Sequence, residues 1–305
     1  MQALVIGEAL VDVVARPGVE PVAYPGGSPA NVAIGLARLG RDVQLLTWLG
    51  EDAEGDLVRD HLEASRVRIA SGSQRAARTS TAKAHIDSAG SATYDFDLEI
   101  DYPEHQVAED AVVVHVGSIG AVIEPGATKV TSLLGSARRR AVLTYDPNLR
   151  PTIMGERDAV RPRVLALVGV SDVVKVSDED LAWLEPGSTP QDVARAWAAA
   201  GPALVVVTLG AEGSFAVTAS GVEVAVTAPA VDVADTVGAG DSFMGGLIDG
   251  LWSTGLLGAA RHDAIAALDA TGLTSLLEQA ARIAAITVSR PGANPPTRQE
   301  LDGGA

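Results

Sequence analysis

Short, almost continuously apolar runs alternate along the chain with segments whose apolar residues recur every three to four positions. The first pattern predicts buried parallel strands, and the second predicts amphipathic helices that cover them. The predicted strands are residues 4–6, 43–48, 112–116, 141–145, 172–176 and 204–208. The predicted helices are residues 28–39, 54–64, 127–138, 158–168, 178–184 and 192–199. This alternation indicates an α/β fold with a mainly parallel central sheet and helices on both faces.

Two parts of the chain depart from this rhythm. Residues 214–219 and 222–227 flank the turn pair Ser220-Gly221, so we expect the sheet to end in an antiparallel hairpin. Residues 11–15 and short alternating stretches within 75–100 predict a second, small sheet, in which residues 87–91 have the composition of a turn. We therefore expect one domain over residues 1–305, with the small sheet outside the main one.

Composition narrows the classes of function. The chain has 305 residues, a formal net charge of −16 and no cysteine, and its five histidines are scattered. These features disfavour a nucleic-acid binder, a disulfide framework and a zinc site. No targeting or membrane-spanning segment is apparent, which fits a cytoplasmic protein. The sequence also lacks a P-loop, a protein-kinase motif set and a dinucleotide fingerprint after the first strand.

The most informative stretch is residues 235–242, Asp-Thr-Val-Gly-Ala-Gly-Asp-Ser, which precedes a helical pattern. Gly238, Ala239 and Gly240 deliver backbone amides to the start of a helix, where free N–H groups and the helix dipole make an anion site. A side chain at Gly240 would then intrude on the anion hole. Asp241 is not needed to bind an anion, but it would suit a base beside one. The combination suggests phosphoryl transfer to a hydroxyl.

Polar residues that suit a ligand rich in hydroxyl groups lie further upstream. Gly26 and Gly27 permit close backbone approach to a ligand, and Asn31 offers both a donor and an acceptor. Asp12 follows the first strand and Arg150 follows the fourth. Ligands of open parallel sheets bind beyond the carboxyl ends of the strands, so we expect these side chains at one site.

Residues 235–242 resemble the C-terminal motif of the ribokinase-like (PfkB) carbohydrate kinases, and residues 24–40 resemble the N-terminal motif of that family. The resemblance covers nearly the whole chain and implies a three-layer ribokinase-like fold. It also implies that Asp241 is the catalytic base, that residues 238–240 form the anion hole, and that Asp12 binds sugar hydroxyls. The small sheet, residues 11–15 and 75–100, would be a lid over the sugar and a candidate surface for a homodimer.

The same resemblance suggests the substrates. Residues 145–150, Tyr-Asp-Pro-Asn-Leu-Arg, are similar to a motif of fructokinase-like members, in which Arg150 would contact substrate. We expect an ATP-dependent kinase that phosphorylates a primary hydroxyl, with fructose favoured and a 2-keto-3-deoxygluconate kinase or a ribokinase-type enzyme as alternatives. An inactive sugar- or nucleotide-sensing protein is the alternative from another class. The intact Asp241 and its glycine loop argue against it.

The resemblance also implies positions for metal ions. Ser177 is followed three residues later by Asp180, where the family commonly has Glu that organises water around magnesium; Glu179 could take this role if the register differed. Both acids could equally complement a helix dipole. In many relatives the position of Asp235 belongs to a monovalent-cation site, such as one for K⁺.

The nucleotide site is implied in the same way. Thr208, Gly210 and Gly213 surround a turn that resembles the nucleotide loop of the family. Asn294 lies in a segment that resembles the loop beside the adenine.

Overall fold

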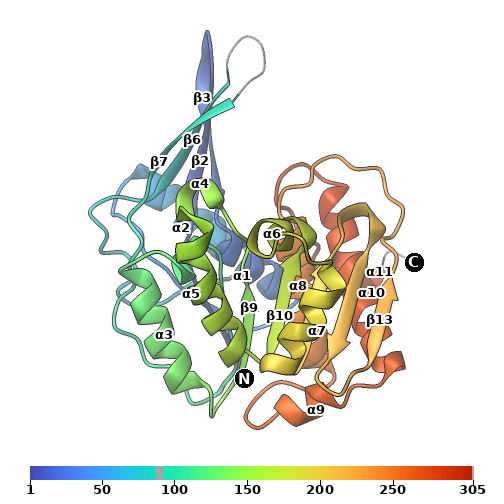
Figure 1. Cartoon of the computed structure of the whole chain (residues 1–305). Coiled ribbons are helices and arrows are strands. Elements are labelled where there is room, and N and C mark those ends of the chain that lie inside the picture. Colours follow the sequence, from blue (N-terminus) through green and yellow to red (C-terminus); the bar gives the residue numbers. More distant parts are fainter. Residues whose placement is uncertain (87–91, 304–305) are drawn as a thin grey trace.

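The computed structural model describes residues 1–86 and 92–303, so the predicted turn at 87–91 lies outside the described part (Figure 1). The strands are β1 (Gln2–Ile6), β2 (Leu10–Arg16), β3 (Val19–Gly26), β4 (Val43–Leu46), β5 (Arg68–Ile69), β6 (Thr81–Ile86), β7 (Ala92–Asp97), β8 (Ala111–Gly117), β9 (Val142–Asp146), β10 (Val173–Ser177), β11 (Leu204–Thr208), β12 (Ser214–Thr218) and β13 (Glu223–Val226). The α-helices are α1 (Ser28–Arg38), α2 (Ala53–Ala64), α3 (Gly126–Ala137), α4 (Pro151–Met154), α5 (Arg157–Val170), α6 (Asp178–Leu184), α7 (Pro190–Ala200), α8 (Ala239–Ser253), α9 (His262–Ala266), α10 (Ala270–Val288) and α11 (Arg298–Gly303). Two 3-10 turns, η1 (Ile119–Ala121) and η2 (Gly210–Glu212), complete the elements.

The central sheet has the strand order β13-β12-β11-β10-β9-β8-β1-β4-β5. In this order, each neighbouring pair between β11 and the β5 edge is parallel. The pairs β11–β12 and β12–β13 are antiparallel. The predicted hairpin edge is therefore confirmed. Because the parallel strands run the same way, their carboxyl ends meet at one edge of the sheet.

Helices cover both faces of this sheet, as the apolar runs predicted. One face packs on α1, α2, α8 and α10, and the other packs on α3, α5, α6 and α7 (Figure 1). In α8 every residue from Asp241 to Leu251 is buried. This helix therefore fixes the position of the glycine loop at its N-terminus.

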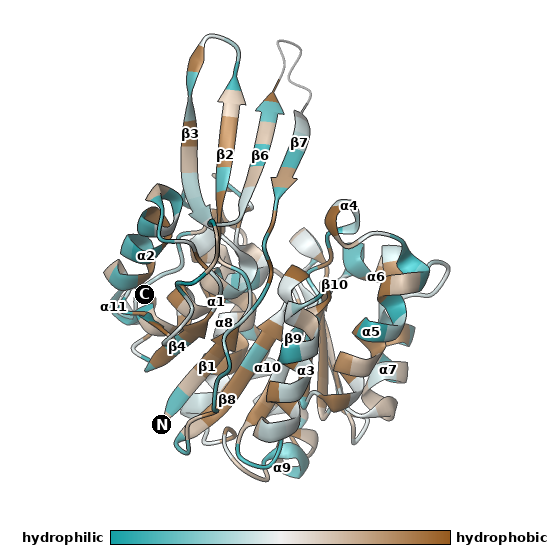
Figure 2. Cartoon of the chain, turned by 90° about the vertical axis from the view of Figure 1, so that its left-hand side faces the viewer, coloured by the Kyte–Doolittle hydropathy of each residue, from teal (hydrophilic) through white to brown (hydrophobic). Residues whose placement is uncertain are grey.

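A second sheet, with the order β3-β2-β6-β7, rises from the edge of the main body (Figure 2). The predicted lid segments contribute β2, β6 and β7, but residues 75–80 and 98–100 are not in its strands. Strand β3 was missed by the sequence analysis. Its sequence, Val-Glu-Pro-Val-Ala-Tyr-Pro-Gly, contains two prolines, which lack the N–H that a central strand needs. Proline is tolerated here because β3 is an edge strand.

One face of the small sheet carries Asp12 together with large apolar side chains. The strand register aligns Tyr24 of β3, Asp12 of β2, Ala82 of β6 and Phe96 of β7. Tyr24 is 54% exposed and Phe96 is 37% exposed, and Phe96 stacks on Tyr94, which is 60% exposed. The predicted apolar face is thus present, and it also carries Asp12, a predicted sugar-binding residue.

In the described residues, none of the helices combines the length and the apolar character that crossing a bilayer requires.

Candidate active site

The Asp241 carboxylate lies in the first turn of α8 and is only 9% exposed. Its Oδ1 accepts a hydrogen bond from Ser28 Oγ at 2.6 Å, and its Oδ2 accepts one from Asn31 Nδ2 at 2.8 Å. Both partners come from the first turn of α1, more than 200 residues earlier in the chain. The two predicted motifs therefore meet at this carboxylate, and the two bonds hold it in one orientation.

The glycine loop presents free backbone amides beside this carboxylate. Gly238 is the N-cap of α8 and adopts a left-handed conformation with φ 76°. Ser242 N donates to Gly238 O at 2.8 Å, so the amides of Gly240 and Asp241 lie before this i→i−4 bond. They are directed out of the helix start, as an anion site requires.

At Gly238 and Gly240 the space beside the Cα is limited by other parts of the protein. A Cβ on Gly238 would lie 2.6 Å from Ala293 Cβ, so this glycine permits the loop at 292–295 to pack on the start of α8. A Cβ on Gly240 would point to Lys175 Nζ, 3.0 Å away. The prediction that a side chain at 240 would intrude on the anion hole stays a prediction, and Lys175 is the first group that such a side chain would approach.

The glycine pair before α1 also acts within the protein. A Cβ on Gly26 would lie 2.4 Å from Asp12 Oδ2. Gly27 has φ 109°, and a Cβ there would lie 2.5 Å from Glu8 O. These glycines allow the turn before α1 to approach β2 and the end of β1, so the close approach is between protein segments.

Three charged side chains lie near the carboxyl edge of the main sheet: Glu8 follows β1, Asp12 lies near the start of β2, and Arg150 follows β9. Partial desolvation raises the pKa of Asp12 although the residue remains exposed, and the positive charge of Arg150 opposes this rise. Burial raises the pKa of Glu8 to about 7, while hydrogen bonds from Ser118 and the Gly120 amide (3.1 Å) lower it. The charge of Arg150 lowers the pKa of both carboxylates, of which Asp12 is a predicted sugar-binding residue.

The structure separates the two candidate magnesium ligands. Asp180 is buried, and its Oδ1 accepts a hydrogen bond from Leu149 N at 2.9 Å, whereas Glu179 is exposed. Burial raises the pKa of Asp180, and the charge of Lys175 is the largest opposing cause. Ser177 is the N-cap of α6, and its Oγ accepts from Asp180 N at 3.0 Å. In the described residues no cluster of three or more His, Cys, Asp or Glu side chains could hold a metal ion.

The predicted nucleotide loop lies at the same edge of the sheet. Thr208 ends β11 and pairs with Ser177 of β10. Gly210 and Gly213 have φ values of 54° and 110°, and a Cβ on Gly213 would lie 2.0 Å from Val226 O. Leu209 N donates to Gly213 O at 2.8 Å and closes the turn.

Two further predicted positions fix the loops around α8. Asp235 accepts from Val237 N at 3.0 Å and from Gly292 N at 2.9 Å, and these backbone bonds lower its pKa. Asn294 Oδ1 accepts from Arg38 Nη1 at 2.6 Å. Asp235 therefore ties the segment that enters α8 to the loop carrying Asn294.

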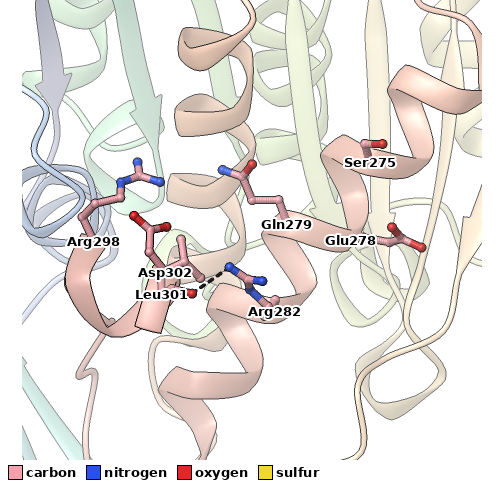
Figure 3. A pocket seen from close by; sticks show the side chains of 7 residues that line it. All are labelled: Ser275, Glu278, Gln279, Arg282, Arg298, Leu301 and Asp302. Atoms are coloured by element: carbon pink, nitrogen blue, oxygen red, sulfur yellow. Dashed lines mark hydrogen bonds between the residues drawn. The ribbon is translucent and has the colours of Figure 1, made fainter. Parts of the chain in front are cut away.

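A separate cavity of about 400 Å³ lies between α10 and α11 (Figure 3). Its lining includes Arg282, which donates to Leu301 O at 2.8 Å, and Arg298, which pairs with Asp249 at 2.6 Å. Asp249 is two turns along α8 from Asp241. The cavity is thus distinct from the cluster of groups around the glycine loop.

Known proteins resemble this chain over nearly its full length. The model of the pfkB family carbohydrate kinases matches residues 2–300. The fructokinase of Rhizobium leguminosarum bv. trifolii is 32% identical over 269 residues, which are 83% of this chain and 81% of that protein. The structure of the fructokinase of Xylella fastidiosa with bound ATP has a TM-score of 0.84 at 26% identity. The match covers 99% of this chain and 97% of that fructokinase chain. A double-mutant fructokinase of Vibrio cholerae O395 with fructose, ADP and a potassium ion has a TM-score of 0.78 at 25% identity, with coverages of 99% and 97%.

The fold and the site together define an ATP-dependent phosphotransferase whose acceptor is a sugar hydroxyl. The chain belongs to the pfkB family of carbohydrate kinases. Its three-layer, mainly parallel architecture with a small additional sheet is the ribokinase-like fold that the motifs implied.

The sequence analysis missed two residues that matter for the site. Ser28 holds Asp241 but reads as an ordinary residue at a helix start, beside Pro29. Lys175 lies beneath the glycine loop, and a signal for it was present, since it is a charged residue inside the predicted buried strand 172–176.

Proposed function

We propose that this enzyme is a fructokinase that transfers the γ-phosphate of ATP to a primary hydroxyl of fructose. The observation that carries the proposal is the Asp241 carboxylate, which Ser28 and Asn31 hold beside the free amides at the start of α8. The fructokinase-like stretch 145–150 and the similarity to fructokinases support fructose as the acceptor.

The sugar would bind between the lid and the carboxyl edge of the main sheet. Asp12 accepts hydrogen bonds from sugar hydroxyls, and Arg150 donates to sugar oxygens. Asn31 uses Nδ2 for Asp241, which leaves its Oδ1 to accept from a hydroxyl. Gly26 and Gly27 contribute by allowing Asp12 and the start of α1 to lie together.

Asp241 would then take the proton of the primary hydroxyl as the oxygen attacks the γ-phosphorus of ATP. The bond from this phosphorus to the bridging β–γ oxygen breaks, and ADP leaves. The amides of Gly238, Gly240 and Asp241 stabilise the negative charge on the transferring group, whereas the amide of Ala239 donates to Thr236 O at 3.3 Å. Thr208, Gly210 and Gly213 would bind the nucleotide, with Asn294 beside its base.

Magnesium would enter with ATP, because Mg²⁺ typically binds through one or two carboxylates together with substrate phosphates. We assign this role to Asp180, which has a second carboxylate oxygen besides the one that Leu149 engages, and not to the exposed Glu179. When bound, the ion would neutralise charge on the β- and γ-phosphates. We also propose that Asp235, which joins two loops at the anion site, supports a monovalent cation such as K⁺.

The small sheet would act as a lid and join two copies of the chain. Its face with Tyr24, Tyr94 and Phe96 is exposed, and a large apolar face favours burial against a partner. Asp12 lies on this face, so covering it would also close the sugar site and exclude water. We place the enzyme in the cytoplasm, where ATP is available, and treat residues 1–305 as one domain.

ADP release with a panel of sugars tests the acceptor. Fructose should give the highest kcat/KM, at least roughly tenfold above ribose and 2-keto-3-deoxygluconate, a factor that corresponds to about 1.4 kcal/mol of transition-state binding. A clear preference for either competitor would refute fructose as the substrate and leave the kinase reaction intact. ADP release that no sugar stimulates would favour the sensing alternative.

A further inference from the structure

The buried ammonium group of Lys175 lies directly under the anion-hole loop. Lys175 is 4% exposed and projects from β10 toward the sheet face that α8 covers. Its Nζ is 2.7 Å from Asp146 Oδ2 and donates to Gly240 O at 3.3 Å. A lysine held beneath a backbone carbonyl of the loop can fix the direction of the amides on the other side of that loop.

Lys175 is also the central positive charge among three carboxylates. Asp146, Asp180 and Asp241 lie close enough for Asp180 and Asp241 to raise the pKa of Asp146, which burial brings to about 6. The charge of Lys175 lowers the pKa of both Asp146 and Asp180. Burial lowers the pKa of His115 to about 3, and the charge of Lys175 is the second cause of this lowering.

Burying the ion pair between Lys175 and Asp146 costs desolvation free energy. Neither carboxylate oxygen of Asp146 has a hydrogen-bond partner of good geometry in the described residues, so the ion pair with Lys175 is its compensation. Buried ion pairs often stabilise a fold no better than apolar residues of similar volume. A chain of net charge −16 that must bind the anionic phosphates of ATP, however, gains from a cation behind the binding loop.

We propose that Lys175 is a positioning residue for phosphoryl transfer. Its ammonium group holds the Gly240 carbonyl, orients the anion-hole amides, and offsets the negative charge of the neighbouring carboxylates beneath the loop. The inference rests on the proposed kinase reaction but not on the identity of the sugar.

The test removes the charge without leaving an unpaired partner. Lys175→Met alone strands a buried carboxylate and is expected to destabilise the protein, so the decisive variant is Lys175→Met with Asp146→Asn, which removes both charges. Lys129→Met is the matched control, because Lys129 also pairs with an aspartate, Asp101 (2.8 Å), on the far side of the sheet from α8. Each variant is assayed with the best sugar of the parent at a temperature well below its melting transition.

The double variant should fold and lose roughly 10- to 100-fold in kcat, comparable to the loss when an outer-shell partner of a metal ligand is removed. Its KM for the sugar should stay within about threefold, because the sugar contacts are untouched, and Lys129→Met should match the parent. A folded double variant with the kcat of the parent would overturn the proposal. A lower kcat together with a raised sugar KM and a lower thermal stability would also overturn it, because these changes would indicate a structural role only. If the parent prefers another sugar than fructose, the comparison proceeds with that sugar, so the acceptor can fail independently of Lys175.

Discussion

Asp241→Asn is expected to abolish most of the activity while preserving the site's geometry. An asparagine amide can keep both observed contacts: its oxygen accepts from Asn31 Nδ2, now 2.8 Å from Oδ2, and its NH₂ donates to Ser28 Oγ, now 2.6 Å from Oδ1. The carbonyl and amide occupy the same volume as the carboxylate. The substitution therefore removes the base and the charge without opening a cavity.

The magnitudes of the two effects differ enough to separate them. Loss of general-base catalysis typically costs roughly 10²–10⁴-fold in rate, which is about 3–5 kcal/mol of transition-state stabilisation. The two hydrogen bonds change from charge-assisted to neutral, a loss of about 1–2 kcal/mol in the free energy of unfolding. We therefore expect a folded protein that binds ADP nearly as well as the parent and turns over at least about a hundredfold more slowly.

Saturating ATP and sugar in an ADP-release assay measures kcat, while calorimetry with ADP and a thermal melt report on binding and fold. Ser28→Ala serves as the control, because it removes one contact of the carboxylate but retains the base, and its kcat should fall far less. If Asp241→Asn turned over within a few-fold of the parent, Asp241 would not be the base.

Three further predictions follow from other parts of the molecule. Gly27→Ala should lower the free energy of unfolding by about 2–4 kcal/mol in denaturant titrations, because φ is 109° and a Cβ would lie 2.5 Å from a carbonyl oxygen; an unchanged midpoint would contradict this. The pKa of Glu8 is raised from 4.5 to about 7, so its protonated form stabilises the fold, and this contribution is lost as the pH rises from 4.5 through 7. Relative to the parent, Glu8→Gln should thus gain stability over that pH range, by up to about 3 kcal/mol, and parallel stability curves would refute the assignment. The proposed dimer predicts that replacing both Tyr94 and Phe96 by Ser reduces the mass in light scattering from dimer to monomer and raises the sugar KM, whereas Val19→Ser, at an exposed position at the start of the edge strand β3, should do neither.

The periodic pattern of the sequence predicted the main sheet well, because each buried strand is a short apolar run between amphipathic helices. It missed β3 because this segment has prolines at positions 21 and 25, which argue against a strand. Proline has no N–H to donate, so a strand can contain it only at a sheet edge, where β3 lies. The small sheet was predicted from alternation and its role as a lid from the resemblance, and the register places Asp12 on the apolar face of this sheet.

At the site, sequence reasoning identified residues better than their contacts. The motif at 235–242 indicated an anion site, but it could not tell which way a Cβ on Gly240 would point, because that depends on the packing of β10 beneath α8. Likewise, no local pattern could show that Asn31 contacts Asp241, since this pair joins residues 210 positions apart. Lys175 is the instructive case: a lysine within an apolar run signals a buried charge, and its purpose emerges only from its neighbours.

The most direct test of the central claim follows the phosphoryl group itself. The protein is incubated with fructose and ATP labelled in the γ-phosphate, and the products are separated and identified by phosphorus NMR. Transfer from ATP to a primary hydroxyl predicts one labelled sugar monophosphate for each ADP formed, with the phosphate on a terminal carbon. Labelled inorganic phosphate without sugar phosphate, or phosphate on a secondary hydroxyl, would contradict the account.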